Sequence, residues 1–84
     1  MFYFYIFQCA DGTLYCGSTN HIQNREIRHN SGHGAKYTRA NGIGKVVYSE
    51  GFETLAEAMR REAQVKKWSR KKKKNLISGK WSKM

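Results

Sequence analysis

The chain has no proline, only two cysteines and six acidic residues among its 84 residues, and no long apolar run. Two cysteines are too few for a disulfide scaffold, so we expect reduced thiols in a cytoplasmic protein. No segment approaches the roughly 18 apolar residues of a membrane helix, and the N-terminus lacks the basic lead-in of a signal peptide. We therefore expect no membrane partner. The length fits one domain over residues 1–84, in which 39% hydrophobic residues supply a small core.

The shortage of acids contrasts with sixteen lysines and arginines, which give a net charge of +10. Self-repulsion of this size opposes folding, and binding to a polyanion is its leading use. Eleven of the sixteen basic residues lie from Arg60 onward, together with a single acid, Glu62. This basic stretch has no wide apolar face to insert into lipid, so its composition favours nucleic acid over a membrane surface.

Hydrophobic patterning and turn residues predict an α/β (α+β) fold with a small three-stranded, mostly antiparallel sheet flanked by helices. The predicted order of elements is β-β-α-β-α-α. Residues 2–17 form a hairpin through the turn sequence ADGT. Residues 21–30 form a short helix that ends at Gly32, and residues 31–44 form a glycine-rich loop.

The second half of the chain adds one strand and two helices. KVVYSE, residues 45–50, is predicted as the third strand, in the centre of the sheet. TLAE is a capping box, in which Thr54 caps and Glu57 reaches back, so a helix begins at about residue 55 and runs to Trp68. Ser69 then caps a further short helix over RKKKKNLI.

Two hairpin registers are open, and they place two tyrosines differently. If DG alone forms a two-residue turn, Tyr5 and Tyr15 point to opposite faces of the sheet. If ADG forms a three-residue loop with Gly12 in a left-handed conformation, Tyr5 opposes Gly17 and both phenols share one face. Tyrosines in strands are otherwise ordinary core or edge residues.

The first predicted helix has Ile22, Arg25 and His29 on one face. Ile22 would anchor that face to the sheet and bring the two basic side chains toward it. The alternative is that Arg25 is solvated and His29 only interacts favourably with the helix C-terminus.

Glu62 interrupts the apolar stripe of the second predicted helix, beside Leu55, Ala58 and Met59. An unpaired buried carboxylate is costly, so this position needs a partner cation, a metal or an edge-of-core location. A surface pair with Lys66 at i,i+4 is the alternative. A metal site here would have one protein carboxylate, with water and phosphate as its other ligands, as magnesium accepts.

The segment from Lys66 to Lys74 is the clearest binding feature. Because Trp68 precedes its lysine run and Leu76 and Ile77 follow it, we expect a helix pinned to the body with its lysines directed to solvent. GAKYTR, in the glycine-rich loop, interleaves basic and aromatic residues, which suits phosphate contact with some base stacking. The predicted nucleic-acid-binding residues are Lys36, Tyr37, Arg39, Lys66, Lys67, Arg70, Lys71, Lys72, Lys73 and Lys74.

Two other kinds of site do not match the sequence. His21, His29, His33, Cys9 and Cys16 lack the close spacing of zinc ligands. Cys16 and the histidines also lack a nucleophile motif, which argues against a covalent Cys-His hydrolase.

Taken together, these residues resemble the GIY-YIG nuclease family, and in particular its small stand-alone bacterial members. YFY at 3–5 and YCG at 15–17 correspond to the two tripeptide motifs. NREIRHN is similar to the helix that carries the family's catalytic arginine, here Arg25, and its histidine, here His29. AMRREAQVKKW is similar to the helix that carries the metal-binding glutamate, here Glu62. SGHGAKYTR looks like the loop that follows in the small members, and Asn75 lies near an asparagine of many members.

The chain also departs from the family pattern. The glycine and isoleucine of the first motif are Tyr3 and Phe4, and the isoleucine of the second is Cys16. These are interpreted as packing changes that leave the phenols in place. Asn24 stands where many relatives have a second arginine, which would weaken phosphate contact without removing the chemistry.

The resemblance implies a divalent-metal-dependent endonuclease that is selective for structure rather than sequence, acts on DNA and serves repair or recombination. Its implied catalytic residues are Tyr5, Tyr15, Arg25, His29 and Glu62, with Glu62 holding one Mg²⁺ or Mn²⁺ ion and Asn75 added to the nucleic-acid-binding residues. Tyr5 would orient or deprotonate the attacking water, if nearby cations lower its pKa.

Two alternatives stay open: a non-catalytic nucleic-acid-binding domain of the same fold, and a basic module that docks on ribosomal RNA or an acidic protein. We expect a monomer or weak homodimer associated with the nucleoid, with a protein partner for targeting left open.

Overall fold

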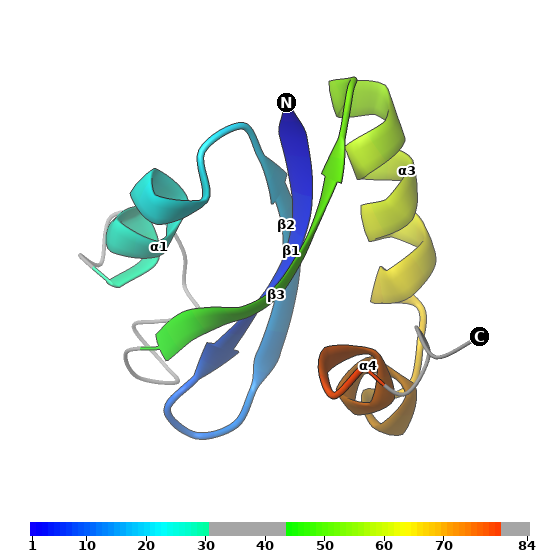
Figure 1. Cartoon of the computed structure of the whole chain (residues 1–84). Coiled ribbons are helices and arrows are strands. Elements are labelled where there is room, and N and C mark those ends of the chain that lie inside the picture. Colours follow the sequence, from blue (N-terminus) through cyan, green and yellow to red (C-terminus); the bar gives the residue numbers. More distant parts are fainter. Residues whose placement is uncertain (31–43, 80–84) are drawn as a thin grey trace.

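The computed structural model describes residues 1–30 and 44–79, which form a sheet with helices on both of its faces (Figure 1). The three strands are antiparallel, in the order β2-β1-β3. The predicted α+β fold and its element order are confirmed. The strands are β1 (Phe2–Cys9), β2 (Leu14–Thr19) and β3 (Gly44–Phe52), and the described helices are α1 (Ile22–Asn30), α3 (Leu55–Lys66) and α4 (Arg70–Ile77).

Strand β1 lies in the middle of the sheet and separates two cores. Because side chains alternate along a strand, Tyr5 and Phe7 pack on the face of α1, while Phe4 and Ile6 pack on the face of α3 and α4. All four side chains are fully buried. Figure 1 shows α1 on one side of the sheet and α3 and α4 on the other, so the sheet is the middle of three layers.

The hairpin adopts the three-residue loop. Gly12 has a φ of +92°, and the Cys9 N–H donates to the Thr13 carbonyl at 2.9 Å. This left-handed residue sets a register in which Tyr5 lies opposite Gly17. The alternative in which the two phenols lie on opposite faces is excluded.

The prediction that the third strand is central is wrong, because β3 is an edge strand beside β1. Its outer edge is partly covered by side chains of α1. A carboxylate oxygen of Glu26 accepts the Val46 N–H at 2.7 Å. The Asn30 carboxamide pairs with both backbone groups of Gly44, at 2.8 and 2.9 Å. These contacts replace part of the missing strand ladder and fix α1 against the sheet.

The caps of α3 and α4 are confirmed. Thr54 Oγ1 accepts the Glu57 N–H, and Glu57 Oε1 accepts the Thr54 N–H, both at 3.2 Å. The Ser69 hydroxyl likewise accepts an N–H from the first turn of α4. Helix α3 ends at Lys66 rather than at Trp68.

Trp68 connects α3 to α4 and carries cations on its ring. The Arg61 guanidinium carbon lies 5.2 Å from the ring centre, and Lys72 Nζ lies 4.4 Å from it. At the start of α4, Arg70 donates to the Gly12 carbonyl at 2.7 Å. Helix α4 is therefore pinned to the body as predicted, although Lys72 is held over the indole and is not directed freely to solvent.

The apolar stripe expected on α3 is only partly buried. Ala58 and Val65 are fully buried against the sheet, but Leu55 is 43% and Met59 is 53% exposed. The helix is rotated so that Leu55, Met59 and Glu62 lie at the margin of the core. Of the alternatives considered for Glu62, the edge-of-core location is therefore the one that the structure shows.

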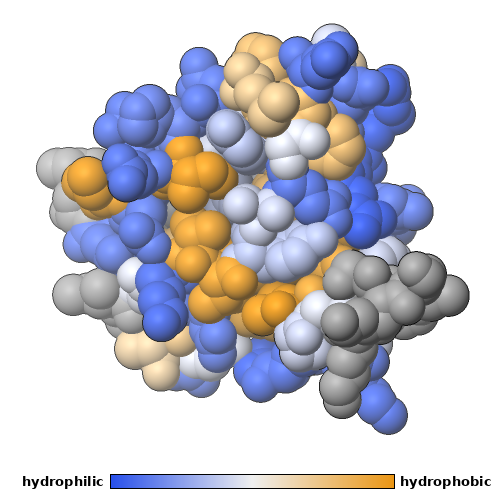
Figure 2. All heavy atoms as spheres, in the orientation of Figure 1, coloured by the Kyte–Doolittle hydropathy of each residue, from blue (hydrophilic) through white to orange (hydrophobic). Residues whose placement is uncertain are grey.

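Figure 2 shows the face of the molecule on which β3 lies. Hydrophobic residues gather near the middle of this face, toward α1, and hydrophilic residues cover most of the rest. Among the residues that the structure describes, no helix has the length and hydrophobicity needed to cross a membrane.

Candidate active site

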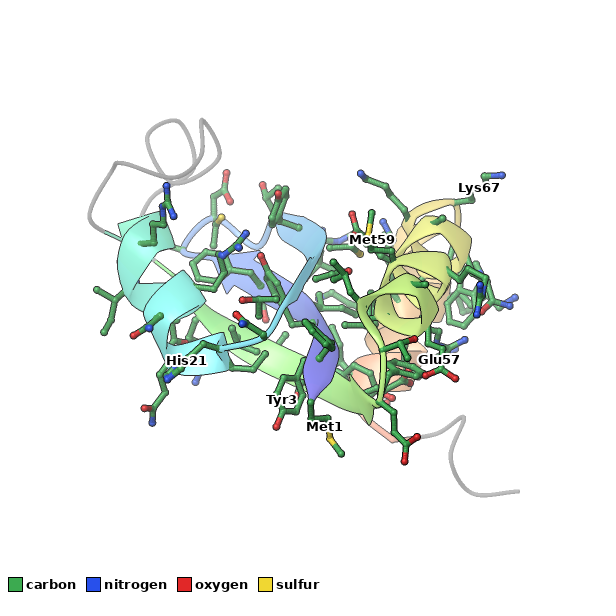
Figure 3. All side chains as sticks on the ribbon, turned by 90° about the horizontal axis from the view of Figure 1, so that it is seen from above. Met1, Tyr3, His21, Glu57, Met59 and Lys67 are labelled. Carbon is green, nitrogen blue, oxygen red and sulfur yellow. The ribbon has the colours of Figure 1, made fainter. Side chains whose placement is uncertain are left out.

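Arg25 from α1 and Glu62 from α3 line one hollow of about 420 Å³ at the β2 edge of the sheet. Figure 3 shows α1 and α3 on opposite sides of the sheet, with Met59 projecting from α3 on the side where β2 lies. Two predicted site residues that are far apart in sequence and belong to opposite layers therefore meet in one place. The remaining lining residues are Phe2, Ser18, Thr19, Asn20, Leu55 and Met59.

The Glu62 carboxylate has two different neighbours. The Ser18 hydroxyl donates to Oε1 at 2.6 Å, and Lys66 Nζ lies 3.6 Å from Oε2. The i,i+4 pair with Lys66, given above as the alternative, is present, but the side chain of Glu62 is only 23% exposed, so Glu62 is not simply a solvated surface residue. Sequence reasoning did not find Ser18. Once the register is known, its position opposite Phe4 places it on the α3 face of β2.

Tyr5 lies on the α1 face of the sheet, the face opposite to that of Glu62, and its side chain is fully buried. The Arg25 guanidinium hydrogen-bonds to the Tyr5 phenol. Burial raises the pKa of Tyr5 from 10.0 to about 12, although the positive charge of Arg25 opposes the rise. The condition under which Tyr5 could act as a base, a pKa lowered by nearby cations, is therefore not met by Arg25, because removal of the phenol from water outweighs its attraction.

Tyr15 shares the α1 face with Tyr5, as the three-residue loop requires. The two ring centres are 6.5 Å apart, with the planes tilted by 53°. Tyr15 is half-buried, so it is the phenol of the pair that keeps some exposure.

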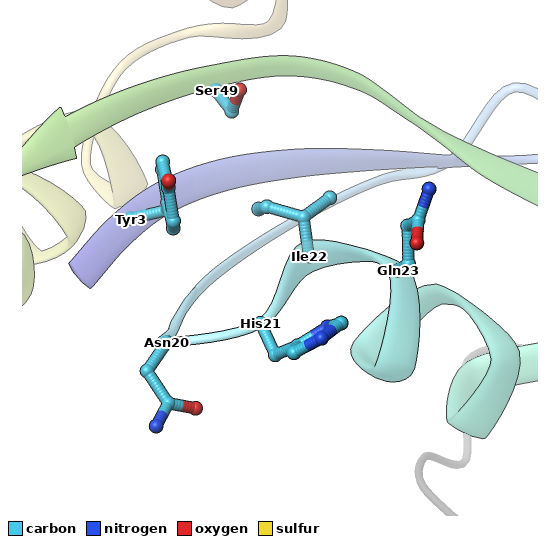
Figure 4. A pocket seen from close by; sticks show the side chains of 6 residues that line it. All are labelled: Tyr3, Asn20, His21, Ile22, Gln23 and Ser49. Atoms are coloured by element: carbon cyan, nitrogen blue, oxygen red, sulfur yellow. The ribbon is translucent and has the colours of Figure 1, made fainter. Parts of the chain in front are cut away.

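Helix α1 is held in place by Ile22, as predicted. Ile22 packs against the buried cluster of Tyr5, Phe7 and Cys9. Figure 4 shows Ile22 pointing toward the strands, beside the ring of Tyr3. Arg25, one turn after Ile22 on the same face of the helix, is half-buried and lines the hollow.

The family model described as the GIY-YIG catalytic domain matches residues 1–75. The chain belongs to the GIY-YIG family. A UPF0213 protein of Bacillus pumilus is 55% identical to it over 71 residues, which cover 84% of this chain and 72% of that protein. A UPF0213 protein of Staphylococcus saprophyticus is 49% identical over 76 residues, which cover 90% of this chain and 93% of that protein.

Two solution NMR structures are similar to this GIY-YIG chain. The UPF0213 protein of Bacillus halodurans is 46% identical, with a TM-score of 0.58 over 93% of this chain and 84% of that chain. A protein of E. faecalis is 39% identical, with a TM-score of 0.62 over 98% of this chain and 88% of that chain. The resemblance drawn from the motif residues is thus confirmed in both sequence and fold.

The glycine that ends the second GIY-YIG motif has a steric reason in this structure. A Cβ atom on Gly17 would lie 2.5 Å from the Tyr5 hydroxyl oxygen and 2.7 Å from the ring carbon that bears it. Gly17 therefore leaves the space in which the phenol of the first motif lies. The two motifs form one packed unit across the β1–β2 pair.

The donor set at Glu62 fits a divalent cation that keeps most of its water. In the described part of the chain, no three His, Cys, Asp or Glu side chains are grouped so that they could hold a metal ion. If a divalent cation binds in this hollow, Glu62 would be its one protein carboxylate, with water and substrate phosphate as the other ligands, a shell that Mg²⁺ accepts.

The two thiols have no part in this site. Cys9 and Cys16 are free and buried, and burial raises the pKa of both. They therefore carry little of the reactive thiolate form at neutral pH.

The other predicted residues fall into two groups. The side chain of His29, in α1, and the whole of Lys36, Tyr37 and Arg39 lie outside the described residues. The remaining group follows Glu62 along α3 and α4. Burial raises the pKa of Cys16 in β2, and Lys73 and Lys66 oppose the rise, so both positive charges act on this thiol.

Proposed function

We propose that this GIY-YIG chain is a divalent-metal-dependent endonuclease that hydrolyses phosphodiester bonds in DNA and selects structure rather than sequence. The observation that carries the proposal is the convergence of Arg25 and Glu62, from opposite layers, on one hollow at the β2 edge. A guanidinium and a carboxylate that line one open hollow can both act on a phosphodiester, the first directly and the second through a cation.

Glu62 would hold one Mg²⁺ or Mn²⁺ ion, which when bound supplies Lewis-acid stabilisation of a phosphate oxygen and of the departing 3′ oxygen. Ser18 keeps Oε1 of this carboxylate in place, so Oε2 is the oxygen left for a ligand. Lys66 Nζ lies 3.6 Å from Oε2 and would partly neutralise the carboxylate of Glu62 when no metal ion is bound.

Arg25 binds the phosphate and neutralises the charge that develops on it in the transition state. Tyr5 stays protonated at neutral pH, because its pKa is about 12. A buried, protonated phenol is not the base for an attacking water, so we assign Tyr5 the role of orienting Arg25. Tyr15 and His29 remain the candidates for orienting the water.

The positive surface that follows Glu62 along the chain would hold the nucleic-acid backbone. It consists of Lys66, Lys67, Arg70, Lys71, Lys72, Lys73, Lys74 and Asn75. These residues give contacts to phosphate rather than to base edges, which matches selection by shape. Such a cut would serve repair or recombination.

The experiment is a cleavage assay on labelled nicked, branched and single-stranded DNA, with the matching RNAs, in Mg²⁺, Mn²⁺ or EDTA. Turnover that requires a divalent ion supports the nuclease. Tight binding without turnover under any of these conditions would overturn it in favour of a non-catalytic binding domain.

A further inference from the structure

A second hollow of about 210 Å³ continues from the first along α1. The two hollows share Thr19, Asn20 and Arg25 in their walls. The second adds His21, Asn24 and Arg28, and none of its described lining residues is acidic. It is therefore a polar, positively charged extension of the candidate active site.

The two arginines of this hollow are three residues apart on one helix, so their Cβ atoms are about 5–6 Å apart. Like charges at this spacing repel each other, and an anion bound beside them would offset that repulsion. The hollow is also smaller than the roughly 300 Å³ of ordinary small-molecule pockets, which favours a single compact anion.

We propose that this second hollow binds the phosphate next to the scissile phosphate, with Arg28 as its principal ligand. The substrate strand then runs from Glu62 across Arg25 and over Asn20 to Arg28. This inference rests on the proposed nuclease function and deepens it, because it gives the strand a direction across the β2 edge.

The neighbouring hollow in Figure 4 does not have the same chemistry. It has a volume of about 370 Å³ and shares Asn20 and His21 with the second hollow. Its other described lining residues are Tyr3, Ile22, Gln23 and Ser49, none of which is a cation at neutral pH. The backbone of a polyanion is therefore expected to pass along α1 toward Arg28 rather than into this hollow.

The test compares Arg28→Ala with Arg60→Ala, which removes the same charge at a different place. Arg60 is exposed and lies about 200° around α3 from the buried Ala58, so it points away from the sheet. Binding of the wild-type chain and both variants to a labelled oligonucleotide is measured in EDTA over a range of salt concentrations. Arg28→Ala should lower the salt slope by about 0.7 on single strands or about 0.9 on duplex, and Arg60→Ala should leave it nearly unchanged.

Equal slopes for the two variants would overturn the inference. Urea unfolding of each variant shows whether it is folded, and Arg28→Gln, which keeps a polar side chain of similar length, replaces Arg28→Ala if the alanine variant unfolds. The binding result does not depend on turnover. It therefore tests whether the second hollow binds a phosphate even if the chain does not cleave nucleic acid and the proposed function fails.

Turnover in Mn²⁺ provides the second readout. If Arg28 binds a flanking phosphate, Arg28→Ala raises KM several-fold and changes kcat by less than about twofold. The reason is that such a contact stabilises the bound substrate and the transition state equally. A fall in kcat with an unchanged KM would overturn the assignment, since it would place Arg28 at the reacting phosphate.

Discussion

The Ser18 hydroxyl donates a 2.6 Å hydrogen bond to Oε1 of Glu62, across 44 positions of the sequence. This bond joins β2 to α3 at the margin of the core and fixes the rotamer of the proposed metal ligand. Hydrogen bonds to a charged acceptor are among the stronger ones in proteins. The orientation of Glu62 is therefore set by the sheet as well as by its own helix.

Replacing Ser18 by alanine should release this carboxylate. We expect about a tenfold loss of Mn²⁺ affinity, as is usual when a partner behind a metal ligand is removed. Mn²⁺ titration followed by electron paramagnetic resonance measures it without any substrate. Ser49→Ala, at an exposed serine of β3, is the matched control, and Ser18→Thr should restore most of the affinity. Unchanged affinity in Ser18→Ala would show that the bond does not position Glu62.

A methyl group on Gly17 should displace the Tyr5 phenol. Because the added Cβ would lie 2.5 Å from the phenol oxygen, Gly17→Ala forces a shift in a fully buried side chain. We expect a loss of about 1–3 kcal/mol in the free energy of unfolding, together with lower cleavage activity. Urea denaturation provides the first value. A variant as stable as wild type would mean that Tyr5 does not need the space above Gly17.

Tyr5 should also give a distinct dependence of stability on pH. Its pKa is 10.0 when exposed and about 12 in the folded chain, so the unfolded chain loses this proton first. The contribution of this proton to the free energy of unfolding is complete below pH 10. It is lost as the pH rises toward 12, with a limiting slope of about 1.4 kcal/mol per pH unit. Urea unfolding of wild type and Tyr5→Phe between pH 9 and 11 tests this. Parallel curves for the two proteins would contradict the raised pKa.

Two lysines of α4 should differ in their effects on nucleic-acid binding and on stability. Lys71 is exposed, whereas Lys72 lies over the Trp68 ring at 4.4 Å. Lys71→Ala should lower the salt slope for duplex binding by about 0.9 and leave stability unchanged. Lys72→Ala should cost about 0.5–1 kcal/mol of stability through the lost ring contact. Fluorescence anisotropy and urea unfolding measure the two effects, and equal behaviour of the variants in both assays would contradict the division.

Local sequence signals were sufficient where the controlling interaction is itself local. The capping box of Thr54 and Glu57 and the cap at Ser69 depend on residues within one turn of each other, and both are present. The hairpin was narrowed to two registers, and the left-handed Gly12 selected one of them. The conformation of the turn thus decided whether Tyr5 and Tyr15 share one face of the sheet.

The order of the strands depends on long-range contacts that leave no local pattern. The apolar residues of β3 are compatible with a central strand, but β1, hydrophobic on both faces, occupies that place. Glu26 and Asn30 cover part of the β3 edge, and nothing in their spacing indicates a partner in a strand beyond residue 43.

In the candidate site, too, local features were predictable from the sequence and long-range contacts were not. Periodicity placed Ile22 against the sheet and marked Glu62 as out of place in its helix. The motif resemblance was needed to relate Glu62 to Arg25, because the two approach each other only when both layers pack around β2. The high pKa of Tyr5 follows from complete burial, which a strand tyrosine does not reveal in sequence.

The most direct test of the nuclease account compares wild type with Glu62→Gln on the same labelled DNA substrates in Mn²⁺ or Mg²⁺, at protein concentrations that give equal DNA binding. The substitution keeps the size of the side chain and a hydrogen-bond acceptor for Ser18 while it removes the negative charge. The account predicts that wild type cuts and that Glu62→Gln binds equally but does not cut. Equal cleavage by the two proteins would contradict it.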